Sequence, residues 1–173
     1  MGRDKSLLEV RGKTLLAHAI EALDPVACEV LLACGPSARY AEHGRRLVLD
    51  RFEDGGPLAG LEAAIAAART EWIAALACDM PRAEAPVFHA LLDRAGNGGL
   101  DVCFLRTERG VEPLCAVYRQ TCLAPMRSAL EAGERKIVSF LRFGRLAADE
   151  VEIDAAAAVN LNTPADLHAE AGS

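Results

Sequence analysis

Trp72-Ile73-Ala74-Ala75-Leu76-Ala77-Cys78-Asp79-Met80-Pro81 is a run of seven apolar residues that ends in an aspartate, a methionine and a proline. Such an uninterrupted apolar run, with helix patterns on both sides, is typical of a strand in a parallel sheet that helices cover on both faces. Ligands of these sheets bind beyond the carboxyl ends of the strands. Asp79 is therefore the first candidate functional residue, either as a metal ligand or as a turn aspartate that bonds its own backbone.

The alternation of strand and helix patterns continues on both sides of this run. We expect further strands over residues 29–34, 46–50, 101–105, 114–118 and 151–153, the first of them buried on both faces. Helices are expected over residues 14–22, 37–43, 61–68, 85–94, 120–132 and 137–143, with a glycine-rich turn over 96–99. The alternation predicts an α/β fold with a mostly parallel central sheet.

Length and composition exclude several classes of protein. The 173 residues, 51% of them hydrophobic, suit one domain over residues 1–173 with a sizeable core. The net charge of −6 disfavours broad binding to nucleic acid or anionic lipid. No apolar run reaches the roughly 20 residues of a membrane span, and no signal-peptide pattern opens the sequence. We therefore expect a cytoplasmic protein that binds neither nucleic acid nor membranes, with its six cysteines mostly buried as free thiols.

Several other polar residues could bind an anionic ligand or could equally be ordinary turn or surface residues. One is a second strand-end carboxylate, three are basic, and two are amides on one face of an extended segment. The loop over residues 55–60 could bring backbone close to a nucleotide and start a helix with free N–H donors. The residues are Lys5, Asp50, Arg135, Lys136, Asn160 and Asn162.

Five motifs along the chain are more informative as an ordered set than singly. They are Met1-Gly2-Arg3-Asp4-Lys5, Gly12-Lys13-Thr14, Gly56-Pro57-Leu58-Ala59-Gly60, Cys78-Asp79-Met80-Pro81 and Asn160-Leu161-Asn162-Thr163-Pro164. In this order and spacing the sequence resembles the molybdenum cofactor guanylyltransferases over essentially its whole length. Ala132-Gly133-Glu134-Arg135-Lys136-Ile137 extends the likeness. The resemblance implies a three-layer, Rossmann-like nucleotidyltransferase fold.

The resemblance also implies a reaction and its residues. GMP would pass from GTP to molybdenum-bound molybdopterin, with release of pyrophosphate and with Mg²⁺ as cofactor. A molybdoenzyme or a cofactor-insertion chaperone would be a further partner. By resemblance, Lys5 and Asp79 are catalytic, Asp79 holds the metal, Lys5, Asp50 and Asp79 bind GTP, and Arg135, Asn160 and Asn162 bind molybdopterin, with Lys136 beside them.

Two departures from the family pattern keep alternatives open. The family normally has a strand and a Leu-Ala-Gly-Gly phosphate loop before the Met-Gly, whereas this sequence starts at Met1. We expect the natural protein to be longer by about 20 residues, the length of one strand and a loop. Ala33 falls where some relatives carry an asparagine at the guanine site. The alternatives are a cytidylyltransferase acting on molybdopterin and a truncated protein that binds a nucleotide without catalysis.

Overall fold

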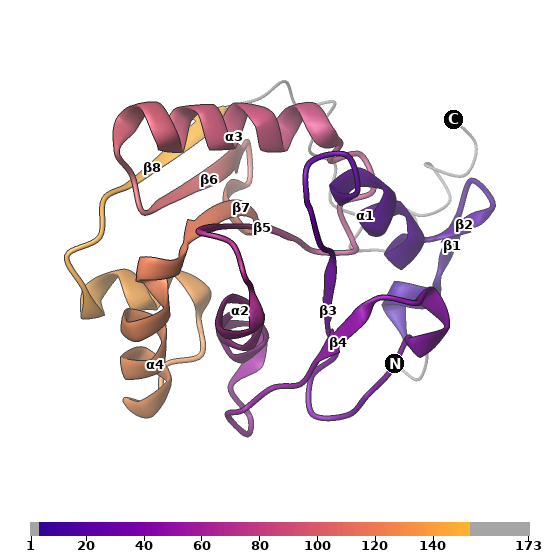
Figure 1. Cartoon of the computed structure of the whole chain (residues 1–173), viewed down its shortest axis with the longest axis horizontal. Coiled ribbons are helices and arrows are strands. Elements are labelled where there is room, and N and C mark those ends of the chain that lie inside the picture. Colours follow the sequence, from indigo (N-terminus) through magenta and orange to yellow (C-terminus); the bar gives the residue numbers. More distant parts are fainter. Residues whose placement is uncertain (1–3, 153–173) are drawn as a thin grey trace.

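The computed structural model describes residues 4–152, which form an α/β fold (Figure 1). Its largest sheet has the strand order β5-β7-β6-β8. Pairs β5–β7 and β6–β7 are antiparallel and β6–β8 is parallel, so β7 alone runs against the other three strands. The predicted α/β fold is confirmed, but the pairing is mixed because β6 and β7 form a hairpin. The strands are β5 (Trp72–Leu76), β6 (Val102–Thr107), β7 (Gly110–Arg119) and β8 (Ala148–Glu152).

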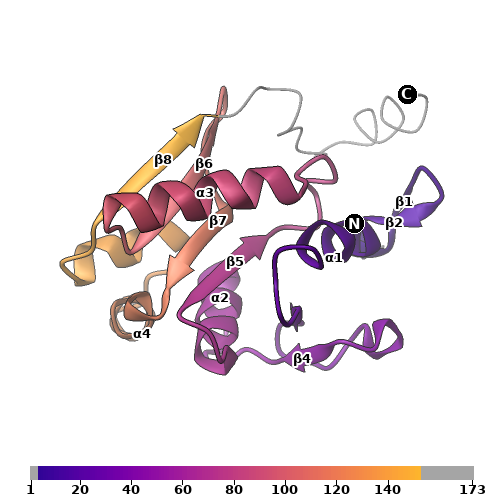
Figure 2. The ribbon, with the colours of Figure 1, turned by 45° about the horizontal axis from the view of Figure 1, so that its top comes forward.

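Helices cover both faces of this sheet (Figures 1 and 2). Successive residues of a strand point to opposite faces. Cys103 and Leu105 therefore pack with Phe88 of α3 (Ala85–Gly98), whereas Val102 and Phe104 pack against the other layer. That second layer consists of α2 (Gly56–Ala67), α4 (Leu123–Glu131) and the 3-10 helix η4 (Ile137–Phe143), with the short η3 (Gln120–Cys122) before α4.

The N-terminal part of the described chain contributes a smaller unit. Strands β3 (Leu31–Ala33) and β4 (Arg46–Val48) pair in parallel, and Leu16 and Ile20 of helix α1 (Leu15–Leu23) pack on Leu32. Helix α1 begins where the Thr14 hydroxyl accepts a hydrogen bond from the Ala17 N–H. The remaining elements are the hairpin of β1 (Glu9–Val10) and β2 (Lys13–Thr14) and the 3-10 helices η1 (Lys5–Leu7) and η2 (Ala41–His43).

The outer edges of β3 and β5 have no strand partner within residues 4–152. All five residues of β5 are only partly buried, and Ala33 in β3 is exposed, so the prediction that residues 29–34 are buried on both faces is wrong. The apolar runs indicate parallel strands, but open edges leave their side chains partly in water. The prediction of an additional N-terminal strand stays a prediction.

Other differences from the sequence analysis are local. The expected turn over 96–99 is mostly helical, because α3 continues to Gly98 and ends at Gly99, whose φ of +62° suits glycine. The thiols are free as predicted, with four buried, but Cys28 is exposed. Among the described helices, none has the length and apolarity needed to cross a membrane.

Candidate functional site

Lys5 and Asp79 meet at the carboxyl end of β5. Asp79 lies three residues beyond the strand. Lys5 lies in η1 and precedes Asp79 by 74 residues in the sequence. The Lys5 ammonium donates a hydrogen bond to Asp79 Oδ2 at 2.9 Å, and both side chains are partly exposed, at 39% and 23%. The fold thus places a cation and an anion of the predicted site in direct contact at the edge where α/β proteins bind ligands.

A hydrogen-bonded cluster around Asp4 fixes the segment that carries Lys5. The Ser6 hydroxyl donates to Asp4 Oδ1 at 2.6 Å, and the Tyr40 hydroxyl donates to Asp4 Oδ2 at 2.6 Å. The Arg39 guanidinium also donates to Oδ2, at 3.1 Å. The hydrogen bond from Ser6, followed by that from Tyr40, lowers the pKa of Asp4. Asp4 therefore stays ionised and ties η1 to the loop that follows β3.

A cavity of about 420 Å³ brings Asp79 together with the basic pair that precedes η4. The backbone oxygen of Arg135 would lie 3.7 Å from a side chain built on Gly56, so the start of α2 lies beside that pair. The first N–H groups of a helix lack intrahelical partners and favour anions. The cavity is lined by Pro57, Ala77, Asp79, Met80, Glu112, Pro113, Leu114, Arg135, Lys136, Ile137 and Val138.

Asp50 lies apart from this cavity, two residues beyond β4. Its N–H donates to the Gly35 carbonyl at 2.9 Å, and its Oδ1 is buried with no hydrogen-bond partner in the described chain. Burial raises the pKa of this carboxyl. A side chain built on Gly60 would lie 3.5 Å from Asp50 Oδ1 and 3.6 Å from the Cβ of Ala33. Asp50 and Ala33 thus face the first turns of α2, apart from the residues that line the 420 Å³ cavity.

Asn160 and Asn162 lie outside the described residues. Glu112, Pro113 and Leu114 line the cavity with Asp79 but were not predicted as site residues. Pro113, directly before the predicted strand over 114–118, was the available signal, because proline in a sheet marks an edge or a bulge.

A buried carboxylate in α2 was also missed. Glu62 is fully buried and forms ion pairs with Arg51, the neighbour of Asp50, and with Arg127 of α4. The Arg127 Nε lies 2.8 Å from Glu62 Oε1. These ion pairs hold the start of the loop after Asp50 against α2 and α4. The Ala-rich pattern of α2 predicts a helix but does not indicate which side chains its single acid would meet.

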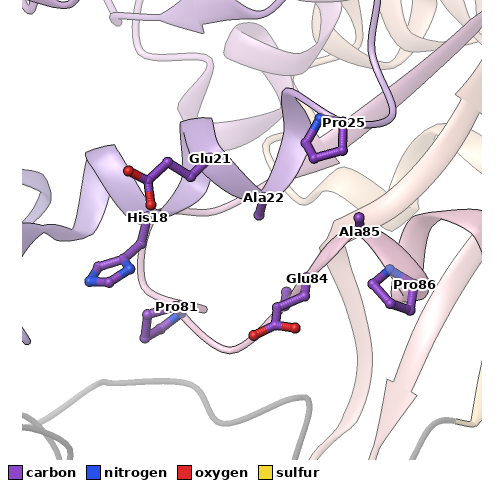
Figure 3. A pocket seen from close by; sticks show the side chains of 9 residues that line it. His18, Glu21, Ala22, Pro25, Pro81, Glu84, Ala85 and Pro86 are labelled. Atoms are coloured by element: carbon purple, nitrogen blue, oxygen red, sulfur yellow. The ribbon is translucent and has the colours of Figure 1, made fainter.

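A second cavity, of about 310 Å³, lies between α1 and the start of α3 (Figure 3). His18 and Glu21 line it from α1, and Glu84 lines it from the residue before α3. The Lys13 ammonium already pairs with Glu21, at 2.7 Å. Of the predicted functional residues between 4 and 152, none lines this cavity, whereas Asp79, Arg135 and Lys136 line the larger one.

The metal-binding capacity of the site rests on Asp79. Within the described residues no group of three or more His, Cys, Asp or Glu side chains could hold a metal ion. A single carboxylate suits a hard cation such as Mg²⁺, which keeps several waters and takes further ligands from substrate phosphates. Asp79 fits that role, whereas a metal held entirely by protein ligands does not fit these residues.

An α/β fold with a lysine and a carboxylate in contact at the end of a sheet strand, beside a cavity that contains Arg135 and Lys136, suits an enzyme of the nucleotidyltransferase class. The chain belongs to one family within that class, because the family model described as "MobA-like NTP transferase domain" matches residues 1–151.

Curated relatives agree with this family. A protein named "Molybdenum cofactor guanylyltransferase" from Pseudomonas fluorescens (strain SBW25) is 36% identical over 176 residues, which cover 99% of this chain and 86% of its own length. The protein of the same name from Ectopseudomonas mendocina (strain ymp) is 37% identical over 172 residues, covering 97% of this chain and 83% of its own.

Solved structures show the same fold. Molybdopterin-guanine dinucleotide biosynthesis protein A from Archaeoglobus fulgidus has a TM-score of 0.80 at 24% identity, over 99% of this chain and 90% of its own. Rv0371c from Mycobacterium tuberculosis H37Rv, solved as a complex with manganese, has a TM-score of 0.74 at 18% identity, over 99% and 94% of the two chains.

Proposed function

We propose that this protein transfers GMP from GTP to the phosphate of molybdenum-bound molybdopterin and releases pyrophosphate. The observation that carries the proposal is the 2.9 Å contact of Lys5 with Asp79 at the end of β5, beside the cavity that contains Arg135 and Lys136. The names of the curated relatives supply the identity of the two substrates.

The charges of the site suit this chemistry. An oxygen of the acceptor phosphate forms a bond to the α-phosphorus of GTP, while the bond from that phosphorus to the pyrophosphate oxygen breaks. Both reactants are anions that repel each other, so the site must hold them in line and neutralise charge. Lys5 faces the nucleotide phosphates in this proposal, and Arg135 and Lys136 face the acceptor phosphate. No general base is required, since a phosphate oxygen is already ionised at neutral pH.

Asp79 would hold the divalent cation together with the phosphates of GTP. Bound there, Mg²⁺ would neutralise the charge that develops on the departing pyrophosphate. Lys5 would then exchange its contact with Asp79 for one with phosphate. Asp50 would bind the nucleotide from the ends of β3 and β4, where its buried oxygen has no hydrogen-bond partner in the described chain.

Replacing Asp79 tests the proposal. We expect Asp79→Ala to lower the rate of GMP transfer at least about 100-fold, because the metal and its charge neutralisation are lost. The rate is measured from pyrophosphate release with GTP, Mg²⁺ and molybdenum-bound molybdopterin. Asp93→Ala, on the exposed face of α3, is the matched control and should keep the wild-type rate. Full turnover by Asp79→Ala would contradict the metal assignment.

The choice of nucleotide separates this function from its alternatives. GTP should support transfer and CTP should not, since the curated relatives are guanylyltransferases. A preference for CTP would identify a cytidylyltransferase instead. Tight binding of GTP without any transfer would identify a non-catalytic nucleotide-binding protein. We further expect a cytoplasmic enzyme that passes its product to a molybdoenzyme or to a cofactor-insertion chaperone.

A further inference from the structure

Glu112 is a carboxylate beside Asp79 that the proposed reaction does not use. Glu112 is one of the residues that line the 420 Å³ cavity together with Arg135 and Lys136, and its carboxylate forms no ion pair with any residue between 4 and 152. In that part of the chain its side chain accepts one hydrogen bond, from the Thr107 hydroxyl at 3.3 Å. An ionised carboxylate can accept about four hydrogen bonds. Most of that capacity is therefore available to a molecule in the cavity.

A bulge in β7 brings Glu112 to this place. Along β6 the pairing passes from Phe104 opposite Ala116 directly to Leu105 opposite Glu112, so three residues of β7 are left without partners on β6. On the other side of β7, the Leu114 carbonyl accepts a hydrogen bond from the Ala77 N–H at 2.7 Å. Bulges of this kind redirect side chains and are common next to active sites.

The buried side chain of Tyr118 anchors the bulge to the hydrophobic core. Its hydroxyl donates a hydrogen bond to the Pro113 carbonyl at 2.5 Å, and its ring is fully buried between Phe104 and Phe140. Proline has no N–H, so its place in the bulge leaves no ladder donor unpaired. Because the residue after Glu112 is anchored to the core, the backbone of Glu112 is held at the edge of the cavity.

The lining of the cavity indicates a ligand with two different ends. Arg135, Lys136 and the start of α2 favour an anionic group such as a phosphate. Glu112 repels such a group and favours N–H donors. Leu114, Ile137 and Val138 also line the cavity and offer apolar surface suited to a flat ring. A volume of about 420 Å³ lies within the usual range for sites that bind small molecules.

We infer that Glu112 is a specificity-determining residue that accepts two N–H hydrogen bonds from a 2-amino-4-oxopyrimidine edge. The pterin of the acceptor and the guanine of GTP share this edge, with one ring N–H and one amino N–H side by side. The inference rests on the proposed function, which brings both rings to the enzyme. The place of Glu112 favours the pterin, since it shares the cavity with Arg135 and Lys136, whereas Asp50 lies apart, at the end of β4.

Two pteridine probes test this inference by binding alone. The first is 6-hydroxymethylpterin phosphate, and the second is its lumazine counterpart, in which a 2-oxo group replaces the 2-amino group. Fluorescence titration of the full chain should show at least about tenfold tighter binding of the pterin, because one charge-assisted hydrogen bond distinguishes the probes. Glu112→Gln should remove this preference. Glu108→Gln, an exposed glutamate at the tip of the same hairpin, is the matched control and should keep it.

The same variants show whether Glu112 binds the 2-amino-4-oxopyrimidine edge of the pterin or that of guanine. If Glu112→Gln weakens binding of GTP but not of ITP, which lacks the amino group, and leaves the pterin titration unchanged, the edge belongs to guanine. If Glu112→Gln and Glu108→Gln do not differ with either pair of ligands, or if the wild type shows neither preference, the inference is overturned. Coincident thermal unfolding curves of the two variants exclude misfolding.

A parallel assay of GMP transfer keeps the two proposals apart. A wild-type enzyme that distinguishes the pteridines but transfers no GMP contradicts only the proposed function. A wild-type enzyme that transfers GMP, with a Glu112→Gln variant of unchanged ligand preference, contradicts only the role of Glu112.

Discussion

Asp50 has a carboxylate oxygen that is buried without a hydrogen-bond partner in the described chain, and that burial raises the pKa of the carboxyl. A raised pKa in the folded state means that folding disfavours the ionised form. The resulting cost to stability is present at neutral pH and disappears at acid pH, where Asp50 is protonated in both the folded and the unfolded states. Residues that lower stability in this way are typical of functional sites.

We therefore expect Asp50→Asn to raise the free energy of unfolding at pH 7 and to leave it nearly unchanged at pH 3. The same substitution should raise the KM for GTP, since the proposed nucleotide ligand is lost. Urea unfolding at the two pH values and initial rates of GMP transfer measure both effects. A variant that is less stable than the wild type at pH 7 would show that the Asp50 carboxylate has a structural partner instead.

Single residues differ in how far the sequence predicts them. Asp50 and Asp79 were predicted because each follows an apolar strand, and ligands of α/β folds bind beyond the carboxyl ends of the strands. The contact between Lys5 and Asp79 depends on a separation of 74 residues, which no local pattern contains. Glu112 was missed because it lies before the predicted strand over 114–118, and although Pro113 is compatible with a bulge, only the pairing of β7 with β6 shows one.

At the scale of elements, α2 depends on the glycine at its N-cap, Gly55. A side chain on Gly55 would lie 2.4 Å from the Cβ of Ala59, 3.1 Å from Leu130 Cδ2 and 3.2 Å from the Phe52 carbonyl. The start of α2 would have to move to admit it. The sequence indicates a glycine-rich loop here, but not that Gly55 is confined by α2 itself and by α4.

Gly55→Ala should destabilise the protein by about 1–3 kcal/mol, the usual cost of overpacking, and should lower GMP transfer because α2 borders the cavity. Gly96→Ala in α3 is the matched control. A side chain there would meet nothing within 4 Å, and alanine in a helix gains about 0.5–1 kcal/mol over glycine. Thermal unfolding of both variants gives the comparison. Equal stability of the two would contradict the confinement of Gly55.

The boundaries of the elements show why some predictions were wrong. Helix α3 includes most of the predicted turn, because the helix continues through Gly96 and Gly98. It ends at Gly99, which adopts a positive φ. Strand β7 is longer than the predicted 114–118, since the β6–β7 hairpin extends it to Gly110. Apolar periodicity locates the middle of an element, whereas hairpin pairing and capping determine its ends.

At the scale of the whole molecule, the four-stranded sheet and the β3–β4 sheet share no strand pairing within residues 4–152. Besides the ion pair of Lys5 with Asp79, apolar packing joins them. Leu23 of α1 packs in the apolar cluster under α3 and also in the cluster around Leu32. Ile73 of β5 packs against the apolar cluster to which α2 contributes, and α2 also approaches Ala33 of β3. The prediction of one domain over residues 1–173 therefore depends on side-chain packing and not on a continuous sheet.

If this packing makes one cooperative unit, a cavity in either part should destabilise both. Ile20 of α1 and Leu91 of α3 are buried in the two different clusters. We expect Ile20→Ala and Leu91→Ala each to cost about 2–5 kcal/mol. Each variant should shift the urea midpoints of far-UV circular dichroism and of Trp72 fluorescence together, because Trp72 is the single tryptophan and lies in β5. If Ile20→Ala moves the dichroism transition and leaves the Trp72 transition in place, the β3–β4 part unfolds on its own, and the chain has two units where the sequence predicts one.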